Sequence, residues 1–119
     1  MRTDRDAYRQ TLIDLYLRLP DTPRRLSRCD LRLVRDLCER QIPLTIVETA
    51  FLLASARRAV RPADALPLGP IRSLAYFLPV IEELLETPLQ HADAYLAYLR
   101  TKVSLRPTPA NANASGVKI

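Results

Sequence analysis

The side chains that most often carry out catalysis are scarce in this sequence and poorly spaced for it. The only histidine is His91, and the only cysteines are Cys29 and Cys38, nine positions apart. A nucleophilic Ser or Cys needs a base beside it, and a structural zinc site needs four Cys or His ligands. One histidine and two separated cysteines provide neither arrangement. We therefore expect a protein that is not an enzyme and that binds neither a metal nor another cofactor.

Two further kinds of chemistry find little support in the residues. Glu82, Glu83 and Glu86 can in principle bind a metal ion, but such a group is more typical of a solvated helix face. The chain has only 2 glycines, so it contains no glycine-rich loop that wraps around a phosphate.

The two cysteines are not expected to form a disulfide. Cys29 and Cys38 fall in one predicted helix about 13 Å apart, which is too far for a disulfide. Free thiols are typical of the cytoplasm, where we expect the protein to reside.

Arginine is the residue type that stands out. The chain has 18 Lys+Arg against 13 Asp+Glu, a formal net charge of +5, and lysine occurs only at Lys102 and Lys118. The guanidinium group presents a rigid fork of donors that suits phosphate, and it stacks on nucleobases. High-GC coding also enriches arginine, so the bias is a modest indication. It points to an anionic partner, with nucleic acid as the first candidate.

The densest group of arginines follows a loop and the helix predicted after it. Arg28, Arg32 and Arg35 recur at i, i+4 and i+7, which places them on one face of a helix. One interpretation is that this face follows a phosphate backbone. The other is that acids four positions further on, Asp36 and Glu39, pair with the arginines and leave an ordinary solvated face. The residues that we expect to bind nucleic acid here are Arg24, Arg25, Arg28, Arg32 and Arg35.

Two further basic clusters raise the expectation of a positively charged binding side. They are Arg57, Arg58 and Arg61 at the end of the third predicted helix, and Arg100 and Lys102 towards the C-terminus. Residues 79–93 contain acids but no Lys or Arg, so charge is segregated along the chain. We therefore expect all three clusters to bind DNA or RNA, mainly through its backbone.

The elements that must position these side chains are helices. Leu and Ala dominate the apolar residues, and prolines separate the apolar segments. The predicted helices span residues 4–18, 27–41, 44–60, 70–86 and 90–103. The helix at 44–60 has few polar positions and is expected to be central and buried, whereas Pro79 is expected to kink or split the helix at 70–86.

These elements predict one all-α domain, a compact orthogonal bundle of about five helices. The domain is expected to cover residues 1–105, and residues 106–119 are expected to form a disordered basic tail because they lose apolar periodicity. The N-terminus is charged and is unlike a signal peptide, and no apolar stretch reaches the roughly 20 residues that span a bilayer. We therefore expect no membrane partner.

The helices predicted at 27–41 and 44–60 are similar in order to a helix-turn-helix. The second of them lacks the polar face that a recognition helix uses to read bases. This difference favours a simple antiparallel pair of helices.

From residue 26 to residue 86 the order of segments resembles the C-terminal helical domain of DnaD-type primosomal and phage replication proteins. The matching features are a helix that begins at Ser27, an Ile-Pro-Leu-x-x-Val-Glu-x-Ala segment from Ile42 to Ala50, and Arg72, Tyr76 and Phe77 leading into Val80, Ile81 and Glu82. Two departures are Pro79, inside the last segment, and the longer loop before it. The resemblance implies DNA binding, contact with replication proteins and an association with mobile elements.

A different function class is a protein-interaction adaptor or a small subunit of a larger nucleoprotein complex. The helix predicted at 70–86 is apolar on nearly all sides. It therefore either packs as core or exposes a patch, with Tyr76 and Phe77, that binds a protein partner or a second copy of the chain. Of these classes, the charge pattern favours nucleic-acid binding.

Overall fold

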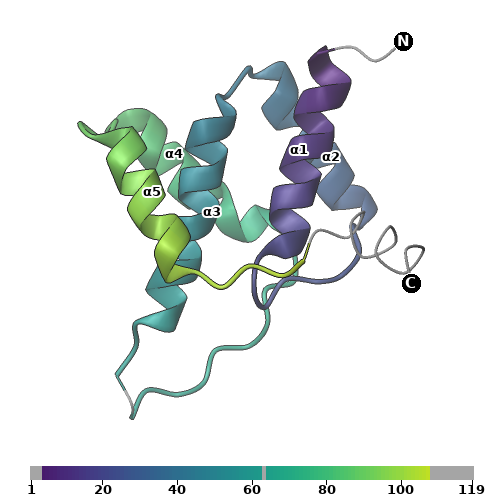
Figure 1. The fold of residues 1–119 in the computed structure, drawn as a ribbon. Helices are drawn as coiled ribbons and strands as arrows, with labels where there is room; N and C mark the ends of the chain where they lie inside the picture. The colour runs from purple at the N-terminus through teal and green to yellow at the C-terminus, as the bar shows by residue number, and fades with distance from the viewer. Residues whose placement is uncertain (1–3, 63, 108–119) are drawn as a thin grey trace, which may run out of the picture.

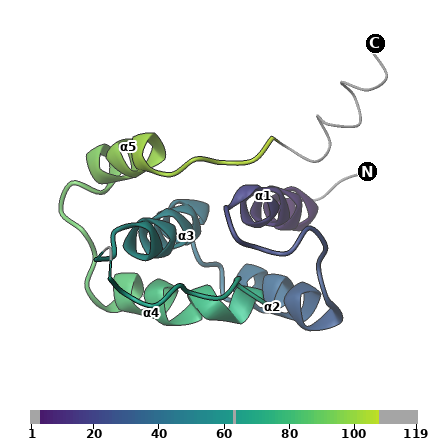
Figure 2. The ribbon, with the colours of Figure 1, turned by 90° about the horizontal axis from the view of Figure 1, so that it is seen from below.

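The computed structural model describes residues 4–62 and 64–107, and within them the chain forms helices and no β-strand. The elements are α1 (Asp4–Arg18), α2 (Arg28–Glu39), α3 (Leu44–Ala59), the short 3-10 helix η1 (Leu74–Phe77), α4 (Leu78–Glu86) and α5 (Ala92–Lys102). They lie in three layers, with α5 on one side, α1 and α3 in the middle, and α2 and α4 on the other side (Figures 1 and 2). The all-α prediction is confirmed.

The helix α3 lies at the centre of the fold, as its sequence predicts. Val47, Ala50, Phe51 and Leu52 are buried, and α3 packs against α1, η1, α4 and α5. Neighbours cover α3 on several sides, so it cannot enter a DNA groove as the second helix of a helix-turn-helix. The expected antiparallel pairing of α2 with α3 is wrong, since α2 packs mainly against α1 and η1.

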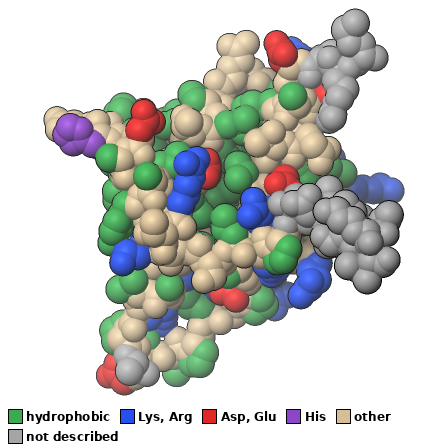
Figure 3. Space-filling model, viewed as in Figure 1, with side chains coloured by type: hydrophobic (Ala, Val, Ile, Leu, Met, Phe, Trp, Pro, Cys, Tyr) green, Lys and Arg blue, Asp and Glu red, His purple; other side chains and the backbone are tan. Residues whose placement is uncertain are grey.

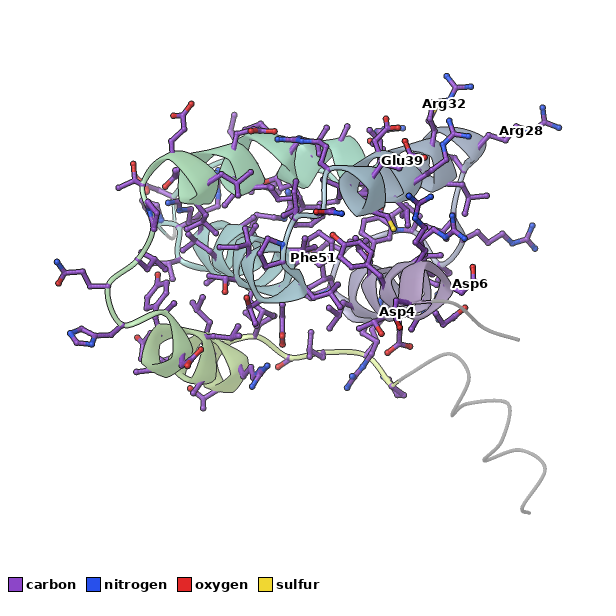
Figure 4. All side chains as sticks on the ribbon, turned by 90° about the horizontal axis from the view of Figure 1, so that it is seen from above. Asp4, Asp6, Arg28, Arg32, Glu39 and Phe51 are labelled. Carbon is purple, nitrogen blue, oxygen red and sulfur yellow. The ribbon has the colours of Figure 1, made fainter. Side chains whose placement is uncertain are left out.

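Three aromatic rings join the elements in the core. Tyr16 of α1, Phe51 of α3 and Phe77 of η1 are buried, and Figure 4 shows Phe51 between the layers. The ring centroids of Phe51 and Phe77 are 4.9 Å apart, and the Tyr16 centroid lies 6.2 and 6.1 Å from them. These separations are typical of favourable aromatic pairs. The expectation that Phe77 contributes to an exposed patch is therefore wrong, because its ring fills the core.

A capping box is present at the start of α2, and its acidic residue has a second role. The Ser27 hydroxyl accepts a hydrogen bond from the Asp30 backbone N–H at 3.0 Å, and the Asp30 carboxylate accepts one from the Ser27 N–H at 3.1 Å. The other oxygen of this carboxylate accepts a hydrogen bond from the backbone N–H of Leu74 at 2.9 Å. The buried Asp30 thus stabilises the first turns of both α2 and η1.

The helix expected over residues 70–86 is shorter and divided. Residues 70–73 are not helical, and the Ile71 backbone N–H is bonded instead to the Asp21 carbonyl oxygen at 2.8 Å. After η1, Pro79 lies in the first turn of α4. Proline is tolerated there because the first N–H groups of a helix have no acceptor within it. Of the two outcomes expected for Pro79, the split is the one found.

The chain after α5 returns to α1 and is fastened there by Arg106. The Arg106 backbone N–H donates to the Arg18 carbonyl oxygen at 2.6 Å, and its guanidinium donates to the Thr22 carbonyl oxygen at 2.6 Å. Arg106 therefore belongs to the folded domain and not to the expected tail. Residues 108–119 of the expected tail lie outside the described residues. Among the described helices, none is long and apolar enough to cross a membrane.

Candidate nucleic-acid interface

The arginines of α2 and of the loop before it face solvent without internal partners. All five residues predicted here are exposed, and none of their side chains forms a hydrogen bond or ion pair with another residue in the ranges 4–62 and 64–107. Figure 4 shows Arg28 and Arg32 projecting from α2 away from the rest of the molecule. We name Arg24, Arg25, Arg28, Arg32 and Arg35 the α2 basic face. Guanidinium groups that are free in this way are available to an anionic ligand.

The alternative interpretation, a helix face neutralised by pairs four residues apart, has no support in the geometry. Asp36 and Glu39 are exposed, and neither is ion-paired within the described part of the chain. The α2 basic face therefore keeps its charge, although these two acids lie on the same helix.

The arginines at the end of α3 are hydrogen-bonded to other residues of the chain. Two guanidinium nitrogens of Arg57 bind the Glu83 carboxylate of α4, at 3.2 and 2.9 Å. Arg58 donates to the Gly69 carbonyl oxygen at 2.7 Å. Arg61 donates to a carbonyl oxygen of the following loop at 2.6 Å. These arginines fasten the end of α3 to α4 and to the loop after α3.

The basic residues at the end of α5 also contact other residues of the chain, and they lie on a different side of the fold from α2. Arg100 makes two hydrogen bonds to the Glu48 carboxylate of α3, at 2.9 and 2.8 Å, and the Lys102 Nζ lies 5.3 Å from the centre of the Tyr98 ring. Because α5 and α2 lie in opposite outer layers (Figure 2), the structure does not bring the three clusters onto one face. On the face that carries α1 and α5, basic side chains are scattered and some lie next to acidic ones (Figure 3).

The carboxylates that bind these arginines also shift the pKa values. The hydrogen bonds to Glu83 raise the pKa of Arg57, and those from Arg57 lower the pKa of Glu83. The hydrogen bonds to Glu48 raise the pKa of Arg100 in the same way. Arg57 and Arg100 therefore stay charged to higher pH, and each arginine, with a carboxylate beside it, offers less positive charge to an external phosphate.

Arg72 is a further free cation close to the α2 basic face. It is exposed and has no hydrogen bond or ion pair with a residue that the structure describes. On either side of it the backbone is joined to the segment 21–30, through Ile71 and Asp21 at 2.8 Å and through Leu74 and Asp30 at 2.9 Å. Arg72 is not among the residues that we expect from the sequence to bind nucleic acid, because a single arginine has no spacing signal.

Tyr76 is the accessible member of the predicted partner-binding pair. It is 44% exposed, and the Arg58 guanidinium carbon lies 5.4 Å from the centre of its ring. Its neighbour Phe77 is buried and meets the Tyr76 ring edge-on at 5.2 Å between centroids. Of these two aromatic residues, only Tyr76 is therefore accessible to an external partner.

The remaining reactive side chains do not gather into a site. His91 is exposed at the start of α5. Cys29 is exposed, Cys38 is buried, and both are free thiols. Within the described residues, no three His, Cys, Asp or Glu side chains lie together as a possible metal site.

Comparisons with known proteins give no match for this chain. No protein-family model matches it, and neither does a curated protein or a solved structure. The resemblance to DnaD-type proteins stays a prediction, and function has to be inferred from the chain's own residues.

Proposed function

We propose that this chain is a nucleic-acid-binding accessory protein, without catalytic activity of its own, that contacts the phosphate backbone through the α2 basic face. The observation that carries the proposal is a contrast among the arginines. Those of α2 and its preceding loop have no internal partner, whereas Arg57, Arg58, Arg61 and Arg100 each have one. Five free guanidinium groups along one loop and one helix suit a polyanion better than a small anion.

Backbone contact fits this surface better than base reading. Direct readout in the major groove relies on Arg, Lys, Asn and Gln side chains that reach base edges. Of these types α2 contains only arginine, and its other exposed side chains are Cys29, Leu31, Asp36 and Glu39. Neutralisation of phosphates by arginine carries no sequence information. We therefore propose binding with low sequence specificity and strong salt dependence.

The test compares two triple variants that lower the net charge equally. Arg28→Gln, Arg32→Gln and Arg35→Gln remove charge from the α2 basic face. The control is a triple variant in arginines that are also exposed but are bound by other residues of the chain, Arg57→Gln, Arg61→Gln and Arg100→Gln. Binding to a labelled oligonucleotide is measured by fluorescence anisotropy over a range of salt concentrations.

We expect the wild-type affinity to fall steeply with salt, because bound phosphates release counterions. Each phosphate contact contributes about 0.7–0.9 to the slope of log K against log salt, so the α2 variant should lose roughly 2–3 from that slope. The control variant should retain most of the wild-type slope and affinity. Absence of binding by the wild type, or equal weakening in the two variants, would refute the proposal.

A second candidate function is protein binding, which is supported by the loop between α3 and η1. Val60 is 83% exposed and Leu66 is 82% exposed. Figure 1 shows this loop extending beyond the end of α3, away from the helices. Exposed apolar side chains close together are typical of protein contact sites. This loop is therefore the surface that supports a protein partner.

A further inference from the structure

Tyr76 is an exposed aromatic residue whose ring packs against two neighbouring side chains. The residue is 44% exposed, and the Arg58 guanidinium carbon lies 5.4 Å from its ring centre. The Arg58 side chain is only 10% exposed and is anchored by its 2.7 Å hydrogen bond to the Gly69 carbonyl oxygen. The Arg58 guanidinium and the Phe77 ring, which meets Tyr76 edge-on, therefore both support the Tyr76 ring. Much of the residue stays accessible to a ligand.

Free arginines lie next to this ring in the fold. Tyr76 belongs to η1, which packs against α2. The first residue of η1, Leu74, is hydrogen-bonded to Asp30 in the first turn of α2 at 2.9 Å. Arg72, two residues before Leu74, is exposed and has no partner among the described residues. The element that carries the exposed ring is thus packed against the helix that carries the unpaired cations, and Arg72 lies four residues before Tyr76.

A second exposed tyrosine lacks this setting. Tyr98 of α5 is 53% exposed, and the Lys102 Nζ lies 5.3 Å from its ring centre. The nearby Arg100 is bound to Glu48 at 2.8 Å. Figure 2 places α5 in the outer layer opposite to α2. Tyr98 therefore matches Tyr76 in type, exposure and a nearby cation, but not in free arginines.

An exposed aromatic ring beside free arginines is the combination that binds single-stranded nucleic acid. Base faces are hidden between neighbouring pairs in a duplex, whereas an unpaired base can stack on a tyrosine while arginines bind the adjoining phosphates. We infer that the ligand of the α2 basic face is a single strand, with one base stacked on Tyr76 and phosphates bound by α2 and Arg72. This inference rests on the proposed function and adds the ligand's class to it. The shared chemistry is an unpaired base beside a phosphate, in DNA or RNA.

Titration of the full chain with labelled oligo(dT), oligo(U) and a DNA duplex of equal length tests the inference. We expect tighter binding to the single strands, and the two strands distinguish DNA from RNA. Because a stacked base contributes roughly 5- to 140-fold in affinity, Tyr76→Ala should weaken single-strand binding about tenfold and leave duplex binding unchanged. Tyr76→Phe, which retains a ring, and Tyr98→Ala, the matched control, should bind like the wild type.

A second readout observes the stacking itself. The chain contains no tryptophan, so Tyr76→Trp supplies the only one. Its fluorescence should be quenched by a single strand and much less by a duplex. If Tyr76→Ala does not fold, this quenching tests the single-strand inference by itself, and equal quenching by a single strand and a duplex would overturn it.

The outcomes separate this inference from the proposed function. If no strand and no duplex binds at low salt, the proposed function fails. If single strands and duplex bind equally, and Tyr76→Ala has no effect, nucleic-acid binding stands and the single-strand inference is overturned. Equal weakening by Tyr76→Ala and Tyr98→Ala also overturns it, because stacking would then not depend on the free arginines.

Discussion

The hydroxyl groups of two tyrosines in α1 differ in their hydrogen bonding. The Tyr8 hydroxyl donates to the Ile42 carbonyl oxygen at 2.6 Å and so ties α1 to the turn between α2 and α3. The Tyr16 hydroxyl is buried in the core without a hydrogen-bond partner among the described residues. A hydrogen bond and an unsatisfied polar group have opposite effects on stability.

Replacing each tyrosine by phenylalanine separates the two effects. Tyr8→Phe should lower the free energy of unfolding by about 1 kcal/mol, because it removes a hydrogen bond. Tyr16→Phe should leave that free energy unchanged or raise it by up to about 1 kcal/mol, because it removes an unsatisfied buried hydroxyl. Urea unfolding measures both values. Equal losses in the two variants would contradict these roles.

The pH dependence of the same two variants follows from the tyrosine pKa values. Burial, together with the nearby Cys38, raises the pKa of Tyr8 to about 12 in the folded chain. An unfolded tyrosine ionises near pH 10, as a rough value. The contribution of the Tyr8 hydroxyl to the free energy of unfolding is therefore fully present below about pH 10. It is lost as the pH rises towards 12, because over this range only the unfolded chain releases the proton. The pKa of Tyr16 is raised by burial and by Asp30, so either Phe variant should lose less stability over this pH range.

At the scale of elements, one buried carboxylate joins two helix starts. Asp30 accepts hydrogen bonds from the backbone N–H groups of Ser27 and Leu74, at 3.1 and 2.9 Å. The first contact closes the capping box of α2. The second holds η1, and with it Tyr76, against α2. The arrangement of the candidate interface therefore depends on this residue.

Variants of the capping box test how much each contact contributes. Ser27→Ala should cost about 1 kcal/mol, as the loss of an N-cap usually does. Asp30→Ala should cost roughly 2–4 kcal/mol, because it also leaves the buried Leu74 N–H without an acceptor. Asp36→Ala, at an exposed position of the same helix, is the control and should change stability by less than about 0.5 kcal/mol. Equal costs for Ser27→Ala and Asp30→Ala in urea unfolding would show that the Leu74 contact contributes nothing.

Helix positions could be predicted from local patterns, whereas some helix ends depend on distant contacts. The predicted bounds of α1 match the structure, and α2 begins after Ser27 because the capping box acts within one turn. Ile71 lies three positions before Leu74, at helical spacing, yet residues 70–73 are not helical. The Ile71 N–H is bonded to Asp21, far away in sequence, and no local pattern indicates that partner.

At the scale of the whole molecule, the candidate site was partly predictable for the same reason. The α2 basic face follows from residue spacing within a single helix. The engagement of Arg57 and Arg100 could not be predicted, because their carboxylate partners lie 26 and 52 positions away. Spacing rules describe only side chains about one turn apart. The clusters that the sequence grouped by charge are therefore divided by the fold into bound and free arginines.

The most direct test of that division is an NMR titration of isotope-labelled protein with a single-stranded oligonucleotide, followed through the Nε–Hε signals of the arginine side chains. A bound phosphate changes the surroundings of the guanidinium groups that contact it, whereas an arginine held by a carboxylate is shielded from such change. We predict that the signals of Arg28, Arg32 and Arg35 shift as the oligonucleotide is added, while those of Arg57 and Arg100 stay in place. Shifts confined to Arg57 and Arg100, or no shift in any of the five signals, would contradict the account.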